Sequence, residues 1–261
     1  MGAQKVFVVT GANRGIGAEY VRQLLLEKDN YVFATMRNVP TDVTAPIKNL
    51  QARYLNEEDD RLALIKLDLT DEASIQAAAA EVEKIKPDGV DYLINNAGIQ
   101  EGMMPALETS AEDYNRVLRT NVVGPFLVTR AFLPLLKKKQ TRTVVNLGSC
   151  LGSCTAVAGT ITNTNPMHSG FLAYNSSKSA INMQTAVLAN QLNAEKFTLI
   201  SIHPGWVGTD MGLYTAEKLG ASKDDPLSPQ QSVEGMLKVV NGLSQKDNGR
   251  FFDYEGKSMD Y

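Results

Sequence analysis

Short apolar runs recur along the chain at regular intervals, and segments with helical periodicity lie between them. The runs are rich in β-branched and aromatic residues, which is typical of parallel strands buried on both faces. The predicted strands are 5–10, 31–36, 62–67, 91–96, 143–148 and 197–203, with a weaker seventh at 250–254. The predicted helices are 15–28, 71–86, 111–138, 174–195 and 229–244, with one weak helix at 44–55.

The alternation of strands and helices predicts the fold class. Such alternation builds βαβ units with right-handed crossovers, which gather the strands into a parallel sheet. We therefore expect an α/β protein with a doubly wound parallel sheet of about seven strands and helices on both faces. A length of 261 residues fits one large domain of this kind, and no interdomain linker is evident, so residues 1–261 are interpreted as a single domain.

Composition narrows the classes of protein. A hydrophobic content of 43% is ample for a core, and a net charge of −3 implies no nucleic-acid partner. No apolar run approaches the ~18 residues that a membrane helix needs, and the segment after Met1 resembles a strand rather than a signal peptide. We expect a soluble, cytoplasmic protein with no membrane partner.

The cysteines and histidines indicate neither a disulfide framework nor a metal site. Cys150 and Cys154 are the only cysteines, which excludes the small secreted class of disulfide-rich protein. Together with His168 and His203 they would make a Cys₂His₂ set, but the residues are too scattered for the spacing of a zinc site. No metal is predicted.

The loop between the first predicted strand and the first helix is rich in glycine. In TGANRGIG, residues 10–17, Gly11, Gly15 and Gly17 have the spacing G-x-x-x-G-x-G, which differs from the G-x-G-x-x-G dinucleotide fingerprint. Glycines here allow the backbone to approach a pyrophosphate, which then lies on the helix N-terminus. An ordinary turn could have the same residues, but the position between a strand and an amphipathic helix favours nucleotide binding.

The end of the second predicted strand bears on the choice of cofactor. A site that prefers NAD usually has an acidic residue there, which holds a ribose hydroxyl. This chain has Met36 followed by Arg37, and Arg14 lies in the glycine loop. Guanidinium groups pair well with phosphates, so the pattern favours NADP(H) with its additional phosphate. The alternative is that either arginine is a solvated surface charge.

The stretch YNSSK, residues 174–178, places a phenol four residues before an amine. On a helix, Tyr174 and Lys178 share a face. A nearby ammonium favours the phenolate, so we expect Lys178 to lower the pKa of Tyr174 and to make it a better acid and base near neutral pH. Taken alone, the pair could equally be two residues that happen to share a helix face.

Considered together, the motifs resemble the short-chain dehydrogenase/reductase family from end to end. They occur in the family's order and spacing, and within the family they look most like sniffer-type and related carbonyl reductases. The resemblance implies a single-domain Rossmann-type fold. The motifs are TGANRGIG at 10–17, DLT at 68–70, NNAG at 95–98, TN at 120–121, NLGS at 146–149, YNSSK at 174–178 and HPGWVGTD at 203–210.

The resemblance implies four catalytic positions. Tyr174 would be the general acid/base, and Lys178 would lower its pKa and hold the nicotinamide ribose. Ser149 would hydrogen-bond the substrate oxygen, which stabilises charge developing there. Asn121 would hold a water that links Lys178 to a proton relay. The structural alternatives are a helix-capping serine and a buried asparagine that satisfies backbone groups.

The resemblance also implies a set of residues around NADP(H). Asp68 and Leu69 would meet the adenine, although Asp68 could simply precede a helix. Thr209 would bond the nicotinamide carboxamide, or act as the N-cap of the segment that follows. The full predicted set is Gly11, Asn13, Arg14, Gly15, Ile16, Gly17, Arg37, Asp68, Leu69, Asn95, Ala97, Gly98, Tyr174, Lys178, Pro204, Gly205, Val207 and Thr209.

Two segments depart from the family or vary within it. Residues 150–173 are roughly a dozen longer than the usual gap between the serine and the tyrosine, and their Thr, Ser, Asn and Gly content predicts an ordered loop or small hairpin. They could form a wall of the substrate pocket or a surface excursion. Residues 210–228 are the predicted substrate lid, in which Met211, Leu213, Tyr214 and Leu219 line the pocket or pack a short helix.

The predicted function is an NADP-dependent oxidoreductase that reduces a ketone or aldehyde to an alcohol. The alternatives are an NADPH-binding regulator on the same scaffold, and non-redox isomerase or cyclase chemistry. The partner is a small-molecule carbonyl or alcohol, and the resemblance allows a homodimer or homotetramer formed through 111–138 and 174–195.

Overall fold

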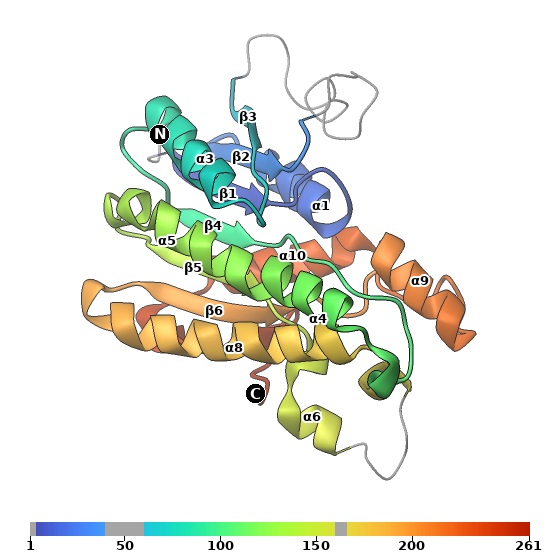
Figure 1. Ribbon diagram of the computed structural model, residues 1–261. Helices are drawn as coiled ribbons and strands as arrows, with labels where there is room; N and C mark the ends of the chain where they lie inside the picture. Colours follow the sequence, from blue (N-terminus) through green and yellow to red (C-terminus); the bar gives the residue numbers. More distant parts are fainter. Residues whose placement is uncertain (1–3, 40–59, 160–165) are drawn as a thin grey trace. The chain divides into compact units, whose positions relative to one another are not determined.

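The computed structural model describes residues 4–39, 60–159 and 166–261 (Figure 1). The predicted weak helix at 44–55 and the middle of the 150–173 segment, residues 160–165, lie outside these ranges. The seven strands are β1 (Lys5–Thr10), β2 (Asn30–Met36), β3 (Leu62–Lys66), β4 (Tyr92–Asn95), β5 (Thr143–Leu147), β6 (Thr198–His203) and β7 (Phe251–Asp253).

The strands form one seven-stranded sheet in the order β3-β2-β1-β4-β5-β6-β7. Neighbouring strands pair in parallel, for example Val8 of β1 with Phe33 of β2 and Ser201 of β6 with Phe251 of β7. The order reverses direction between β1 and β4, as in a doubly wound sheet. The predicted fold class and all seven predicted strands are confirmed.

The helices follow the predicted periodicity with a few differences. Their bounds are α1 (Gly15–Leu24), α3 (Glu72–Ile85), α4 (Ala111–Leu118), α5 (Gly124–Lys137), α6 (Cys154–Ala158), α7 (Pro166–Ser169), α8 (Leu172–Leu192), α9 (Asp210–Leu219) and α10 (Pro229–Asn241). The predicted helix at 111–138 forms as α4 and α5, which are joined by a π-helical turn at Arg119–Val123.

The chain packs as two compact units, each built from two stretches of sequence. Unit 1 comprises Met1–Ala97 and Phe126–Val145, and unit 2 comprises Gly98–Pro125 and Asn146–Tyr261. The interpretation of residues 1–261 as a single domain stays a prediction.

Unit 1 has the glycine loop and the first half of the sheet. Strands β1 and β2 are almost wholly buried, as their apolar sequences predict. Helix α1 packs against β1 and β2, and α3 packs against β3 (Figure 1). Tyr20 and Val21 of α1 and Ile75 and Val82 of α3 are fully buried. Strands β1, β2 and β3 are therefore covered by closely packed helices in this unit.

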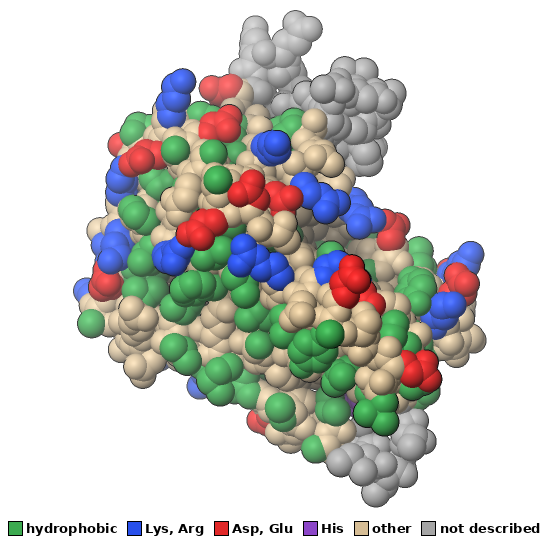
Figure 2. All heavy atoms as spheres, in the orientation of Figure 1, with side chains coloured by type: hydrophobic (Ala, Val, Ile, Leu, Met, Phe, Trp, Pro, Cys, Tyr) green, Lys and Arg blue, Asp and Glu red, His purple; other side chains and the backbone are tan. Residues whose placement is uncertain are grey.

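Unit 2 is organised around the long helix α8, which lies along β6 (Figure 1). Its core includes Ile181 of α8 and the residues Leu199 and Ile200 of β6. Another face of α8 is open, since Met183 is 66% exposed and Val187 is 55% exposed. Hydrophobic side chains accordingly gather along α8 in the space-filling view (Figure 2). Self-association through this helix stays a prediction.

No helix within the described ranges is long and apolar enough to cross a membrane.

Candidate active site

The glycine loop of unit 1 has a backbone that other residues could not adopt. Gly11 and Gly15 have φ values of +64° and +55°. A Cβ added to Gly11 would lie 2.8 Å from Cβ of Ala97, and one added to Gly17 would lie 2.3 Å from the carbonyl oxygen of Gly11. The loop therefore needs glycine at these positions, because the space that a side chain would take is filled by Ala97, Asn96 and the loop's own backbone.

Asn96 and Thr10 hold this loop in place. The Asn96 side-chain amide donates to the carbonyl oxygens of Thr10 (2.8 Å) and Gly11 (3.3 Å). The Thr10 hydroxyl accepts from the backbone N–H groups of Asn96 (3.0 Å) and Ala97 (3.1 Å). Asn96 was not among the predicted site residues, although it lies inside the NNAG motif that indicated the site. Its role depends on a contact with the loop after β1, which spacing alone does not show.

Helix α1 begins directly after the loop with no local cap. Arg14 is its N-cap, with extended backbone and no side-chain hydrogen bond to the first turn, and that turn has no acidic residue. Asn13 and Arg14 are exposed, whereas Ile16 is half-buried. The first N–H groups of a helix carry partial positive charge, so this end suits an anion.

Arg37 and Asp68 lie near each other beside the ends of β2 and β3. Hydrogen bonds from the N–H and hydroxyl of Thr70 lower the pKa of Asp68, and the charges of Arg37 and Lys66 lower it further. Arg37 is exposed, whereas Met36 before it is buried. No acidic side chain therefore occupies the position after β2 that a ribose-binding acid would take.

Leu69 and Asn95 are mostly inside the protein. Leu69 is buried. The Asn95 amide donates to the hydroxyl of Thr129 at 3.1 Å, which braces the end of β4. Asn95 thus supports the central strand through its contact with Thr129, and its contact with a cofactor stays a prediction.

Asn121 lies on the π-helical turn in unit 2 and is buried. Its amide donates to the carbonyl of Ile99 (2.7 Å) and to the hydroxyl of Ser177 (3.0 Å), and its oxygen accepts from the N–H of Ile99 (2.8 Å). A Cβ on Gly98 would lie 3.3 Å from that oxygen and 3.9 Å from Nζ of Lys178. Asn121 thus joins the loop after β4 to α8, beside the Lys178 ammonium, and the water relay stays a prediction.

Ser149, Tyr174 and Lys178 come together in unit 2. The Ser149 hydroxyl lies close enough to the Tyr174 phenol to lower its pKa, and the Ser149 oxygen accepts from the N–H of Leu151 at 3.2 Å. Lys178 lies one turn after Tyr174 on α8, with Nζ 5.5 Å from the centre of the phenol ring. Nζ donates to the carbonyl of Leu147 at 2.6 Å. The shared helix face is confirmed, and Ser149 adds a capping contact to its predicted role.

The expected lowering of the Tyr174 pKa is not found. Burial raises the pKa of Tyr174 to about 12, the Ser149 hydroxyl lowers it, and Cys150 and Glu101 raise it. Burial also lowers the pKa of Lys178 to about 8, since desolvation disfavours its charge. The amine contacts the Leu147 carbonyl rather than the phenol oxygen, and burial is the largest influence on the phenol. At neutral pH Tyr174 is therefore protonated.

The loop after β6 has a tightly held backbone. Gly205 has φ +81°, and a Cβ there would lie 2.6 Å from Cδ1 of Leu227. The Pro204 carbonyl accepts from the hydroxyl of Ser232 at 2.6 Å, and the buried Val207 pairs with Leu227. The Thr209 hydroxyl accepts from the N–H of Gly212 at 3.4 Å, so Thr209 is the N-cap of α9. Its bond to a carboxamide stays a prediction.

The two variable segments contain more helix than was expected. Residues 150–159 and 166–173 hold the short helices α6 and α7 instead of a hairpin. The 210–228 segment begins with α9, where Met211, Leu213, Tyr214 and Leu219 are half-buried. Helix α9 is the short helix that was one of the two alternatives for 210–228, whereas α6 and α7 were not predicted because each is short and relies on neighbours. Thr155 of α6, for example, donates to the carbonyl of the C-terminal Tyr261.

Within the described ranges, no group of three or more His, Cys, Asp or Glu residues could hold a metal ion.

Comparisons with known proteins place the chain in a family. The family model for short chain dehydrogenases matches residues 5–219. An uncharacterised oxidoreductase of Schizosaccharomyces pombe is 36% identical over 260 residues, which cover 97% of this chain and 96% of that protein.

Solved structures agree with this result. NADPH-bound carbonyl reductase from chicken fatty liver is 35% identical, with a TM-score of 0.84 and coverage of 99% of this chain and 100% of that chain. Carbonyl reductase Sniffer of D. melanogaster is 29% identical, with a TM-score of 0.82 and coverage of 100% of both chains. The chain belongs to the short-chain dehydrogenase/reductase family and is an oxidoreductase of that family.

Proposed function

We propose that this protein reduces a ketone or aldehyde to an alcohol with NADPH, and that Tyr174 is the proton donor. The observation that supports this most directly is the grouping of three side chains: the Ser149 hydroxyl beside the Tyr174 phenol, and Lys178 one helical turn further on, with Nζ 5.5 Å from the phenol ring. The relatives that are carbonyl reductases support the substrate class. The substrate is a small molecule, since the family acts on small alcohols and carbonyls.

The residues of unit 1 fit the phosphate end of a dinucleotide. Gly11 and Gly17 allow a tight turn in which no Cβ would fit, and α1 begins directly after it without a side-chain cap. A pyrophosphate could accept hydrogen bonds from such N–H groups. Arg37, with no acid at the end of β2, would hold the additional phosphate of NADPH. When bound, NADPH supplies the hydride for the reaction.

The residues of unit 2 fit the proton transfer. A phenol with a pKa of about 12 is protonated at neutral pH, so Tyr174 can donate to the carbonyl oxygen of a substrate as negative charge develops there. The Ser149 hydroxyl would donate to the same oxygen and stabilise that charge. Lys178, with its pKa near 8, remains largely an ammonium at neutral pH and would hold ribose hydroxyls.

A panel of ketones and aldehydes, followed by the loss of NADPH absorbance, tests the proposal. We expect turnover with NADPH, and a fall of about 10²–10⁴-fold in the Tyr174→Phe variant, which is the usual contribution of a general acid. NADPH binding, measured by titration, should persist in that variant. Tyr31→Phe removes a hydroxyl from β2 and is the matched control. A folded Tyr174→Phe variant with undiminished turnover would contradict the proposed role.

The regulator alternative predicts a different pattern of results. NADPH would bind with the same dependence on Arg37, but no carbonyl of the panel would be reduced. The scaffold's use for isomerase or cyclase chemistry would also leave the NADPH absorbance unchanged. The Ser149 hydroxyl beside the Tyr174 phenol favours the reductase, because a protein that only senses NADPH needs no proton donor beside a substrate-binding hydroxyl.

A further inference from the structure

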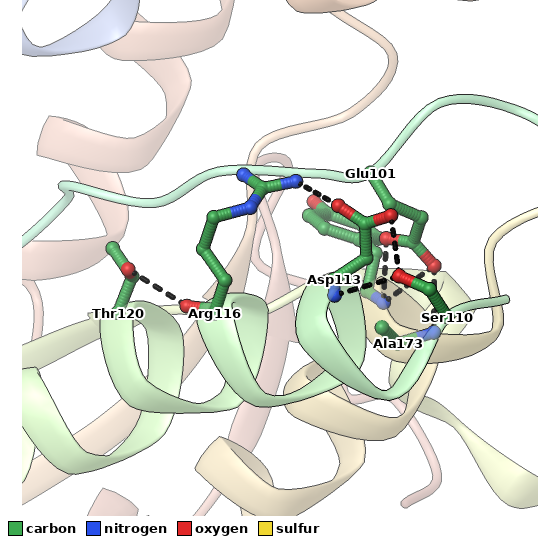
Figure 3. Close-up of polar contacts among 7 residues, drawn as sticks. Glu101, Ser110, Asp113, Arg116, Thr120 and Ala173 are labelled. Carbon is green, nitrogen blue, oxygen red and sulfur yellow. Dashed lines mark hydrogen bonds and ion pairs between the residues drawn. The ribbon is translucent and has the colours of Figure 1, made fainter.

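Glu101 is a buried acidic residue that the reaction described above does not use. It lies in the loop after β4 and is only 2% exposed. One carboxylate oxygen accepts from the N–H of Ala173 (2.6 Å) and of Tyr174 (3.2 Å), and the other accepts from the N–H of Tyr174 at 3.0 Å. Figure 3 shows Glu101 reaching down to the first turn of α8 at Ala173.

Helix α8 has no cap of its own that could do this. Its N-cap position is Phe171, which has no polar atom in its side chain and makes no capping bond. Other helices use an adjacent residue, such as Asp71 for α3 and Ser110 for α4. For α8 the cap comes from a residue 72 positions earlier in the chain. A buried carboxylate is costly unless it is satisfied, and the amides and the dipole of α8 satisfy it.

We propose that Glu101 is a positioning residue for Tyr174: its carboxylate fastens the first turn of α8 and places a negative charge beside the phenol. This inference rests on the proposed role of Tyr174 as proton donor. Glu101 holds the backbone N–H of Tyr174, and the Ser149 hydroxyl lies beside the phenol at the other end of the side chain. A fixed first turn of α8 sets the direction in which the Tyr174 side chain leaves the helix.

Glu101 is itself held by a loop with long-range contacts. Two residues later, the N–H of Met103 donates to the hydroxyl of Tyr214 on α9 at 3.1 Å. The N–H of Met104 donates to the carbonyl of Gly170 at 3.0 Å, in the segment just before α8. The loop from Glu101 to Met104 therefore links the start of α8 to the predicted lid and to the 150–173 segment.

The negative charge of Glu101 raises the pKa of the Tyr174 phenol. The titratable groups that face Tyr174 are Glu101 from the loop after β4, Cys150 from the segment after β5, and Lys178 from α8 itself. Glu101 and Cys150 both oppose formation of the phenolate. Removing the charge of Glu101 should therefore make Tyr174 easier to deprotonate.

Two variants separate the charge from the cap. Glu101→Gln keeps one oxygen that can accept from both N–H groups but removes the charge, whereas Glu101→Ala removes both. Glu108→Gln is the matched control, because it removes one negative charge from an exposed position nearby in the chain. The ionisation of Tyr174 is followed by NMR of ¹³Cζ-labelled tyrosine, with the signal assigned by its loss in Tyr174→Phe. This measurement needs no activity and no substrate.

In Glu101→Gln we expect the pKa of Tyr174 to fall by about 0.5 pH unit, because a nearby like charge raises a phenol's pKa. The high-pH limit of carbonyl reduction should move down by the same amount, while kcat below that limit stays within about threefold of the wild type. Glu101→Ala should lose about tenfold in kcat through a misplaced phenol, with NADPH affinity within about twofold, because proton transfer depends on tight positioning. Glu108→Gln should change none of these.

An unshifted Tyr174 signal in folded Glu101→Gln, or full turnover in folded Glu101→Ala, would overturn the proposal and leave Glu101 as a simple helix cap. Failure of the proposed function looks different. In that case the carbonyl panel would be inactive in the wild type, while the NMR shift in Glu101→Gln would still report whether Glu101 acts on Tyr174. If Glu101→Ala does not fold, the ¹³C measurement on Glu101→Gln decides alone.

Discussion

Helices α1 and α8 both begin beside predicted site residues, but their first turns are satisfied in opposite ways. At α1 the N-cap is Arg14, no side chain caps the turn, and no acid lies in it. At α8 the buried Glu101 accepts from the N–H groups of Ala173 and Tyr174. One helix end keeps its positive potential for a visiting anion, and the other is permanently neutralised by the protein's own carboxylate.

The difference indicates two uses of the same local feature. An N-terminus that is to bind a phosphate must leave its N–H groups without an internal acceptor, at some cost in helix stability. An N-terminus that is to hold a proton donor in place benefits from a fixed internal acceptor. The two regions also differ in buried charge, because Glu101 and Lys178 are buried in unit 2 whereas Arg14 and Arg37 in unit 1 are exposed.

The largest effect on NADPH binding is expected when a carboxylate is placed at the N-terminus of α1, as one already is at α8. Arg14→Asp should weaken NADPH binding by at least about 100-fold, since a charge-assisted phosphate contact contributes about 1.5–3 kcal/mol and the aspartate adds repulsion. The thermal midpoint should not fall, because aspartate is a preferred N-cap. Calorimetric titration and a melting curve measure both, with Lys28→Asp as a control for charge at an exposed site. Unchanged NADPH affinity would show that this helix end does not bind the phosphates.

Arg37 tests the same region at the additional phosphate. Arg37→Asp should weaken NADPH binding by about 10- to 100-fold, because the lost contact contributes about 1.5–3 kcal/mol. NADH lacks that phosphate, so its affinity in the same variant is the internal control and should be equal or better. Tighter binding of NADH than of NADPH by the wild-type protein would contradict the predicted preference.

The stability of the folded protein should also fall in acid, because of His203 in unit 2. Burial lowers the pKa of His203 to about 4, Lys178 lowers it as well, and Asp253 opposes this. The unfolded chain takes up this proton near pH 6.5 and the folded chain only near pH 4, so stability is lost as pH falls through that window, by about 3 kcal/mol. Urea unfolding of His203→Asn should lack this loss. His168→Asn changes the only other histidine and is the control. A wild-type curve that parallels His203→Asn across the window would contradict the depressed pKa.

The smallest effect is expected at a cap that has no second role. The Ser110 hydroxyl accepts from the N–H of Asp113 at 3.0 Å at the start of α4 (Figure 3). Ser110→Ala should cost about 1 kcal/mol of stability, which is usual for an N-cap. The ¹³Cζ titration of Tyr174 should not move, in contrast to Glu101→Gln. A shift in Ser110→Ala as large as in Glu101→Gln would mean that any loosened helix end alters the phenol.

The sequence alone was sufficient for the strands, the main helices and the glycine loop. Apolar runs report burial on both faces, and glycine spacing after a strand reports a turn, because both are local properties of the backbone. The positions of Tyr174 and Lys178 on one helix face followed from the period of the helix. The family motifs added the expected roles of Ser149 and Asn121. In the structure both residues lie beside α8.

What the tertiary structure decided depends on contacts between distant residues. Three features join segments that are far apart in the chain. They are the contact of Asn121, on its π-helical turn, with Ser177, the bracing of the glycine loop by Asn96, and the cap that Glu101 supplies to α8. The pKa of Tyr174 moved opposite to the expectation because burial, which spacing does not report, is the largest influence on the phenol. Local patterns specify which elements form, whereas packing specifies what surrounds each ionisable group and hence what it can do.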